Sequence, residues 1–138
     1  MEDQRELTPN LTLPLAEVSQ LSPLVLAYIG DGVFELAVRT RLVHAGIRKP
    51  DELHKAAVRQ VRAEAQAALA RALEPRLTEA ELDLIKRGRN AKGRTPQGTT
   101  SIADYRLSTG FETLLGYHYL AGNRERLAEI LDWIFALQ

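Results

Sequence analysis

The sequence predicts an all-α protein with a single domain. Apolar residues recur at helical spacing through most of the chain, helix-starting residues precede each such stretch, and no segment shows a convincing strand pattern. A length of 138 residues is enough for one domain with a sizeable core and too short for two ordinary ones. We expect residues 1–21 to form an irregular lead-in and residues 22–138 to form the folded domain.

Composition excludes several classes of protein. The chain is 45% hydrophobic and 26% charged, which is typical of a soluble globular protein. The absence of cysteine excludes disulfides and thiolate metal sites. The start of the chain is polar and acidic, and no run of 18 apolar residues occurs, so we expect no signal peptide, no membrane span and a cytoplasmic location.

Charge is unevenly distributed along the chain, although the formal net charge is zero. Residues 39–94 hold fourteen basic and seven acidic residues, whereas residues 1–38 hold one basic and six acidic residues. A basic middle third favours a polyanionic partner, with an ordinary solvated surface as the alternative.

The first expected helix begins at Ser22 and Pro23, a serine cap followed by a proline in the first turn, and ends near residue 45 before Gly46. Residues 24–38 are apolar nearly all round, which predicts a buried helix.

Two acids interrupt this first helix, Asp31 and Glu35, which lie one turn apart on the same face. Asp31 stands between Gly30 and Gly32, and a glycine inside a helix costs about 1 kcal/mol relative to alanine. Two interpretations stay open here. Either the glycines allow close helix packing while Asp31 faces solvent, or the glycines and the acid belong to a functional site.

A second helix is expected from Pro50 to about Leu73. One face of it is apolar, and another face carries hydrogen-bond donors at helical spacing, namely Lys55, Arg59, Arg62 and Gln66. A solvated face and a row of phosphate contacts explain this second face equally well.

A third helix is expected to start at the capping box formed by Thr78 and Glu81. Residues 86–100 then contain five basic residues, three glycines and a proline, but no acid. This composition predicts a mobile surface loop that a polyanion orders in part.

The fourth expected helix covers about residues 101–121 and contains Glu112, the only acid between residues 111 and 121. Small residues lie one turn from both isolated acids, with Ser108 and Thr109 near Glu112 and Ala27 near Asp31. The space beside each carboxylate suits a hydrated cation better than a packed core. A last amphipathic helix is expected after a cap at residue 123.

Two ionised carboxylates in apolar helices are costly unless they are paired, hydrogen-bonded or bound to metal. Ligation by oxygen alone favours Mg²⁺ or Mn²⁺ over zinc. A metal-activated water beside a basic loop would suit phosphodiester hydrolysis. The three histidines lack metal-ligand spacing: His118 is interpreted as a core or interface residue, His54 as a candidate RNA contact, and no role is assigned to His44.

Three separated motifs carry a resemblance to a known family: YIGDGVFE at 28–35, RGRNAK at 87–92 and YRLSTGFETLLGYHYL at 105–120. They resemble Mini-ribonuclease III, the branch of the ribonuclease III family that lacks the double-stranded-RNA-binding domain, over residues 20–138. The resemblance implies the all-α ribonuclease III endonuclease fold and a homodimer. It also implies Mg²⁺-dependent cleavage of double-stranded RNA to 5′-phosphate ends, in maturation of the large-subunit ribosomal RNA precursor.

The resemblance also assigns residues to the site. Asp31 matches the signature aspartate, a metal ligand at the catalytic centre, and Glu112 matches the late glutamate that shares the metal. Full-length ribonuclease III has two further acids where this chain has Ala27 and Thr109. We therefore expect one Mg²⁺, with Mn²⁺ as a substitute, held by two carboxylates and water. Glu35 is interpreted as structural or interfacial.

The basic residues supply the expected RNA-binding surface. It comprises Lys86, Arg87, Arg89, Asn90, Lys92 and Arg94, extended by Lys55, Arg59 and Arg62. The expected partners are double-stranded RNA, ribosomal precursor in particular, a second copy of the chain, and as a further candidate a ribosomal protein. The alternative is a non-catalytic RNA-binding or ribosome-associated helical module, in which the two acids would be structural.

Overall fold

The all-α prediction is confirmed. A computed structural model describes residues 11–93, 96, 98 and 100–138, and all regular structure in these residues is helical. Its elements are α1 (Leu15–Gln20), α2 (Pro23–His44), α3 (Pro50–Val61), α4 (Ala63–Leu73), the 3₁₀ turn η1 (Glu74–Arg76), α5 (Glu79–Asn90), α6 (Ile102–Leu120) and α7 (Arg124–Ala136). None of the helices within these residues is long and apolar enough to cross a membrane.

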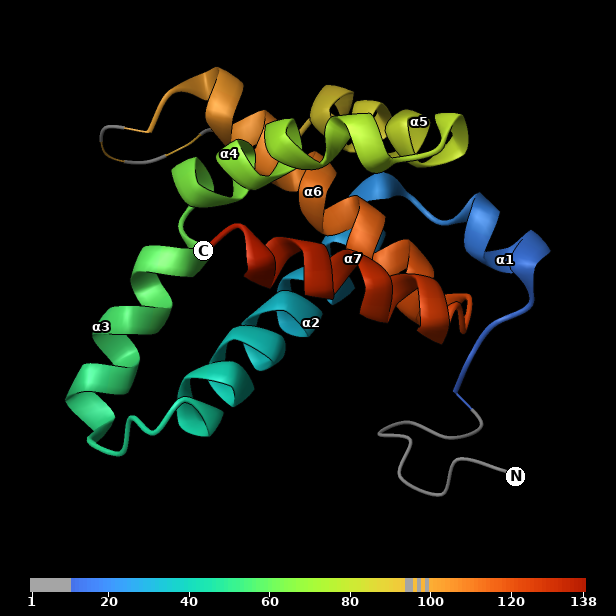
Figure 1. Cartoon of the computed structure of the whole chain (residues 1–138). Helices are drawn as coiled ribbons and strands as arrows, with labels where there is room; N and C mark the ends of the chain where they lie inside the picture. Colours follow the sequence, from blue (N-terminus) through green and yellow to red (C-terminus); the bar gives the residue numbers. More distant parts are fainter. Residues whose placement is uncertain (1–10, 94–95, 97, 99) are drawn as a thin grey trace, which may run out of the picture.

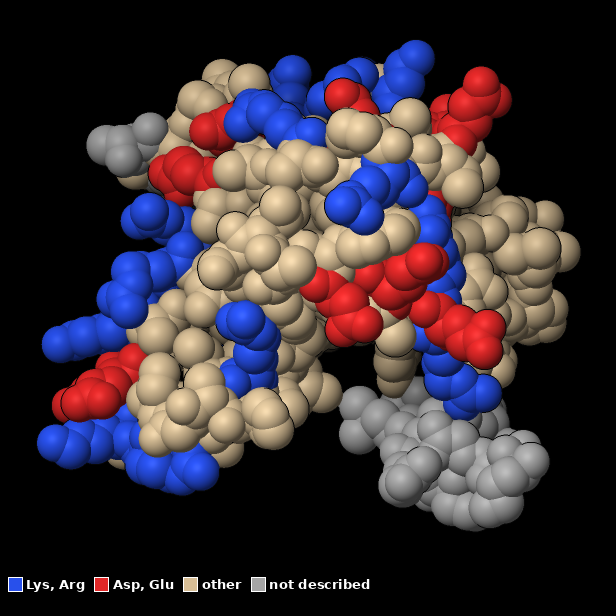
Figure 2. Space-filling view, viewed as in Figure 1, with Lys and Arg blue, Asp and Glu red and all other residues tan. Residues whose placement is uncertain are grey.

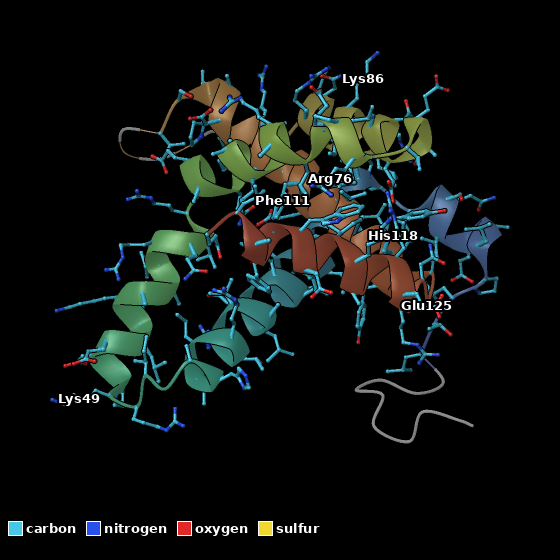
Figure 3. The ribbon with its side chains drawn as sticks, viewed as in Figure 1. Lys49, Arg76, Lys86, Phe111, His118 and Glu125 are labelled. Carbon is cyan, nitrogen blue, oxygen red and sulfur yellow. The ribbon has the colours of Figure 1, made fainter. Side chains whose placement is uncertain are left out.

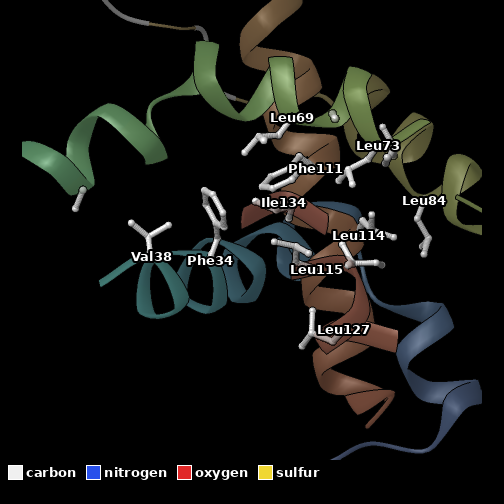
Figure 4. Close-up of a cluster of buried hydrophobic side chains, with 14 of the residues drawn as sticks. Phe34, Val38, Leu69, Leu73, Leu84, Phe111, Leu114, Leu115, Leu127 and Ile134 are labelled. Atoms are coloured by element: carbon white, nitrogen blue, oxygen red, sulfur yellow. The ribbon is translucent and has the colours of Figure 1, made fainter. Parts of the chain in front are cut away.

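Helix α6 is the central element of the fold. It packs against α2, α4, α5 and α7, while α3 leaves this group and packs along α2 (Figure 1). The core lies where these helices meet, and Phe34 of α2 contacts Phe111 of α6 edge to face with ring centroids 5.0 Å apart (Figure 4). The residue that follows Phe111 is Glu112, so the core pair fixes the part of α6 that carries this acid.

Glycines set the distance between α6 and its two main neighbours. A Cβ atom added to Gly30 of α2 would lie 2.6 Å from the carbonyl carbon of Glu112, and one added to Gly116 would lie 2.7 Å from that of Leu26. On the α5 side, a Cβ atom on Gly88 would lie 2.7 Å from the Cα atom of Gly110. Side chains at these positions would push the helices apart, so the backbones approach closely only because they are glycines.

The local helix signals are confirmed at both ends of several helices. The Ser22 hydroxyl accepts from the backbone N–H of Leu24, and Thr78 and Glu81 form a complete capping box. Gly46 and Gly122 follow α2 and α6 with φ values of +106° and +76°, a conformation that favours glycine.

The prediction of one helix from Pro50 to Leu73 is wrong in its continuity. The backbone of Arg62 is extended, with φ −66° and ψ 156°, and this residue separates α3 from α4. Because of this break, α3 packs on α2 while α4 packs on α6 (Figure 1).

Two further predictions of irregular structure are also corrected. Residues 86–90 of the expected loop are the last turns of α5, because Gly88 packs closely on α6. Residues 15–20 of the expected lead-in form α1, which buries Val18 completely while Leu15 stays 61% exposed.

Helix α2 is less buried than its composition predicts. Its buried side is formed by Leu26, Ala27, Gly30, Phe34, Val38 and Leu42, whereas Tyr28 is 79% and Leu36 is 51% exposed. The apolar residues on the outer side of α2 therefore remain uncovered within one chain.

A buried polar cluster joins α5, α6 and α7. Glu81 accepts two hydrogen bonds from Arg126, at 2.7 and 2.6 Å, and contacts Nε2 of His118 at 2.8 Å (Figure 3). The side chain of Asn123 contacts Nδ1 of His118 at 3.0 Å instead of capping α7. His118 is thus a core residue, as predicted, and its burial lowers its pKa.

Candidate active site

Asp31 and Glu112 lie together where α2 crosses α6. Gly30 and Gly116 bring the two backbones into contact, and Asp31 lies close enough to Glu112 to raise the pKa of the Glu112 carboxyl. Asp31 is exposed and Glu112 is half-buried, so the pair opens towards solvent on one side. The close-packing interpretation of the first-helix glycines therefore holds at one of the two. Gly30 packs closely on α6, whereas a Cβ atom on Gly32 would meet nothing within 4 Å.

The pair is electrostatically unfavourable without a cation. Burial raises the pKa of Glu112, and the nearby charge of Asp31 raises it further, to about 8. The side chains that act most strongly on Glu112 are Asp31, Gln66 and Glu35, and none of them is a cation. An ionised Glu112 therefore needs a positive charge that the neighbouring side chains do not supply.

The two carboxylates fit a divalent cation of the Mg²⁺ type. Their oxygens are the ligands that Mg²⁺ prefers, and Mg²⁺ keeps several waters and needs only one or two carboxylates. Among the described residues, no group of three or more histidine, cysteine, aspartate or glutamate side chains could hold a metal ion. The Oε1 atom of Gln66 is buried beside this pair without a hydrogen-bond partner within the described part of the chain. These features agree with the expectation of one cation held by two carboxylates and water.

Gln66 is the site neighbour that the sequence pattern did not reveal. It was expected on the exposed donor face of one long helix, but it is only 2% exposed, and its amide donates to Oε2 of Glu112 at 3.3 Å. That expectation is wrong because the break at Arg62 turns α4 relative to α3. A signal was present, since position 66 shares helical spacing with three buried apolar positions, Leu69, Ala70 and Leu73.

The basic residues of α3 form an exposed edge of the molecule. Lys55 and Arg59 are exposed one turn apart on α3, and Arg62 is exposed at the junction with α4. Lys and Arg side chains gather along this edge and over α5, whereas Asp and Glu side chains gather over α7 (Figure 2). The α3 edge leads towards the acids, because Gln66 follows Arg62 by one turn and contacts Glu112.

The basic residues near the end of α5 divide between two hollows. Lys86 and Arg89 line a hollow of about 400 Å³ against α4, and Lys86 points outward from α5 (Figure 3). Asn90 and Lys92 line a second hollow, of about 420 Å³, whose wall includes Thr109, three residues before Glu112. Arg87 lies on the same turn of α5 and is half-buried, and Arg94 lies outside the described residues. Asn90 and Lys92 thus share a hollow with the α6 turn that precedes Glu112, although neither acid lines it, whereas Lys86 and Arg89 line a different hollow.

The segment between α5 and α6 is attached to α4 at its far end. The Thr100 hydroxyl donates to Glu64 at 3.0 Å, and Arg71 pairs with Asp104 at 2.7 Å. These contacts attach the first turn of α6 to α4, so the helix that carries Glu112 and the helix that carries Gln66 are held together.

Glu35 forms an ion pair with Arg39 at 3.4 Å. Its charge also raises the pKa of Glu112, but less than burial and Asp31 do. His54 lines a hollow between α2 and α3 that also includes Glu35, away from the acid pair, and His44 is exposed near the end of α2.

An apolar groove of about 680 Å³ runs between α2 and α7. Gly32, Val33 and Leu36 line it from α2, and Leu131 and Phe135 line it from α7. Ile29 also lines the groove, so the residues of α2 that line it begin before Asp31 in the sequence and continue after it.

Comparisons with known proteins agree on one family. The model of the ribonuclease III domain matches residues 24–123. The Mini-ribonuclease 3 of Symbiobacterium thermophilum is 50% identical over 86% of this chain and 91% of its own length. That of Brevibacillus brevis is 47% identical over 97% and 95%. A crystal structure of a protein from Fusobacterium nucleatum superimposes with a TM-score of 0.77 and 26% identity, covering 87% of this chain and 96% of that one.

Proposed function

Because the chain belongs to the ribonuclease III family, in its Mini-ribonuclease III branch, we propose that it is a Mg²⁺-dependent endoribonuclease that cleaves double-stranded RNA. In this proposal residues 22–138 are the nuclease domain, Asp31 and Glu112 are the catalytic metal ligands, and the products carry 5′-phosphates. The single observation that carries the proposal is the close approach of α2 and α6 at Gly30, which brings Asp31 near Glu112.

This contact favours catalysis over a purely structural role for the acids. Carboxylates more than about 8 Å apart could not share one cation with metal–oxygen bonds of about 2 Å. The close approach of α2 and α6 at Gly30 brings Asp31 near Glu112, and the raised pKa of Glu112 indicates that a cation would relieve their repulsion. A non-catalytic RNA-binding module would have no use for two adjacent, uncompensated acids.

Each part of the site has a defined task. Bound Mg²⁺, or Mn²⁺ in its place, supplies an activated water and stabilises negative charge on the phosphodiester and the departing oxygen. Asp31 and Glu112 hold that cation, Asp31 from the exposed side and Glu112 from the half-buried side. The space on the exposed side admits the RNA backbone.

RNA is held by the basic residues on either side of the acids. Lys55, Arg59 and Arg62 lie along the α3 edge, and Asn90 and Lys92 lie in the hollow beside Thr109. Lys86, Arg87, Arg89 and Arg94 extend the basic surface. Such contacts read the shape and phosphates of A-form RNA, so we expect little base specificity and a strong dependence of affinity on salt.

The active form is a homodimer in this proposal. The apolar groove between α2 and α7 and the exposed Leu36 offer a surface that a second copy would cover. A two-fold axis would place two sites on one duplex, one for each strand. The proposed substrate is the large-subunit ribosomal RNA precursor, with a ribosomal protein as a further candidate partner.

Cleavage of long double-stranded RNA tests the proposal. Wild type, Asp31→Asn and the control Asp132→Asn, an exposed aspartate on α7, are compared with Mg²⁺ and with EDTA. We expect wild type and the control to cut only with Mg²⁺, and Asp31→Asn to bind RNA without cutting. Equal binding and no cutting by all three proteins, with ribosomal precursor duplexes included, would instead support the RNA-binding module.

A further inference from the structure

Gln66 makes two hydrogen bonds that fix the direction of its amide. Nε2 donates to the carbonyl oxygen of Val61 at 2.8 Å and to Oε2 of Glu112 at 3.3 Å. The Val61 carbonyl oxygen has no proton to offer, so a flipped amide would place Oε1 against another acceptor. The side chain is 2% exposed, which leaves it little freedom to move away.

The same amide closes the junction between α3 and α4. Val61 is the last residue of α3, and Arg62 is extended, so the Val61 carbonyl lies at a helix end that needs a donor. The backbone N–H of Gln66 bonds to the carbonyl oxygen of Arg62 at 3.0 Å, within the first turn of α4. One residue therefore connects the end of α3 with the acid on α6.

We propose that Gln66 is a positioning residue that holds the Glu112 carboxylate in the orientation required to bind the divalent cation. This inference rests on the proposed function. Gln66 is the neutral donor to Glu112, and its position is set by the α3–α4 junction, not by Glu112 itself. The Glu112 carboxylate is thereby held in place before the cation binds. The same side chain links the α3–α4 junction, where Arg62 lies, to Glu112.

The unpartnered Oε1 atom of Gln66 supports the same role. Buried polar atoms rarely lack a hydrogen-bond partner, and this one belongs to an amide that already contacts a proposed metal ligand. Residues that orient metal ligands in this way typically change metal affinity or activity about 10- to 100-fold when they are replaced.

The experiment compares Gln66→Met with Gln60→Met. Methionine has a similar size to glutamine and tolerates burial, but it donates no hydrogen bond. Gln60 is the matched control, since it is a half-buried glutamine on α3 whose Oε1 also lacks a partner in the described chain. Within the described residues, the glutamine that bonds to Glu112 is Gln66. Each protein is titrated with Mn²⁺ in a calorimeter without RNA, and kcat and KM for double-stranded RNA are measured separately.

We expect Gln66→Met to weaken Mn²⁺ binding and lower kcat about 10- to 100-fold, with KM for RNA close to that of wild type. Gln60→Met should match wild type in Mn²⁺ affinity and kcat. The proposal is overturned if Gln66→Met loses thermal stability while its Mn²⁺ affinity and kcat equal those of the control. A wild type that neither binds Mn²⁺ nor cuts RNA would instead remove the proposed function.

A measurement on the unsubstituted protein covers the case in which Gln66→Met does not fold. The side-chain amide resonance of Gln66 is followed by NMR during titration with Mg²⁺. We expect it to shift and to saturate with the Mg²⁺ affinity of the protein. An amide resonance that stays fixed while Mg²⁺ binds would overturn the positioning role.

Discussion

Replacing Gly30 by alanine tests whether the α2–α6 crossing positions the two acids. The new Cβ atom would lie 2.6 Å from the carbonyl carbon of Glu112 and 2.9 Å from the backbone nitrogen of Gly116. Ordinary van der Waals contact begins near 3.4 Å, so the two helices must separate by about 1 Å. Overpacking of this kind costs roughly 1–3 kcal/mol, more than the gain of about 1 kcal/mol in helix propensity.

The matched control is Gly32→Ala on the other side of Asp31. A Cβ atom there meets nothing within 4 Å, so the substitution should stabilise the chain by up to about 1 kcal/mol. A 1 Å displacement of catalytic groups can cost about 100-fold in rate, so Gly30→Ala should cut RNA about 100 times more slowly in single-turnover assays. Urea denaturation gives the two stabilities. If Gly30→Ala equals Gly32→Ala in stability and rate, close contact at Gly30 does not position the site.

Three further predictions concern charge. Burial would raise the pKa of Glu81, but Arg126, the Thr78 N–H and His118 together lower it to about 2. The ionised Glu81 therefore contributes roughly 3 kcal/mol to the free energy of unfolding above pH 4.5, and this contribution is lost as the pH falls towards 2. The stability of Glu81→Gln should not show this decrease at low pH. A plot of stability against pH that is the same for Glu81→Gln and wild type would contradict the lowered pKa of Glu81. Glu112→Gln should abolish cleavage yet stabilise the protein in EDTA at pH 8. The reason is that the stability of wild type falls as the pH rises from 4.5 through the raised Glu112 pKa of about 8. Thermal melts of wild type and Glu112→Gln that coincide at pH 8 would contradict this prediction. Arg59→Gln should reduce the slope of log affinity against log salt by about 1 without changing kcat, and an unaltered slope would place Arg59 outside the RNA contact.

Much of the helix pattern was predictable because its signals are local. The cap at Ser22, the capping box of Thr78 and Glu81, and the stops at Gly46 and Gly122 each depend on a few neighbouring residues. The two site acids were also identifiable, because isolated carboxylates in apolar helices need a special reason and the surrounding motifs resemble a known family. Their mutual contact could be tested only in three dimensions.

The break at Arg62 had no local signal. Residues 50–73 contain good helix formers without an internal glycine or proline, so propensity favours one continuous helix. In the fold, α3 follows α2 while α4 packs on α6, and the amide of Gln66 closes the junction. Contacts between elements distant in sequence outweighed the local preference, and the same contacts buried Gln66.

The sequence by itself determined the helical class and most helix ends, since these follow from residue type and short-range spacing, and it predicted Asp31 and Glu112 as the site acids. Only the tertiary structure decided which groups meet. It placed Asp31 against Glu112, divided the basic residues of α5 between two hollows, and turned Gln66 from the expected exposed face towards Glu112. The physical reason is that glycines at the helix crossings allow backbone contact between α2, α5 and α6, and the placement of Asp31 near Glu112 follows from the close approach at Gly30 and Gly116.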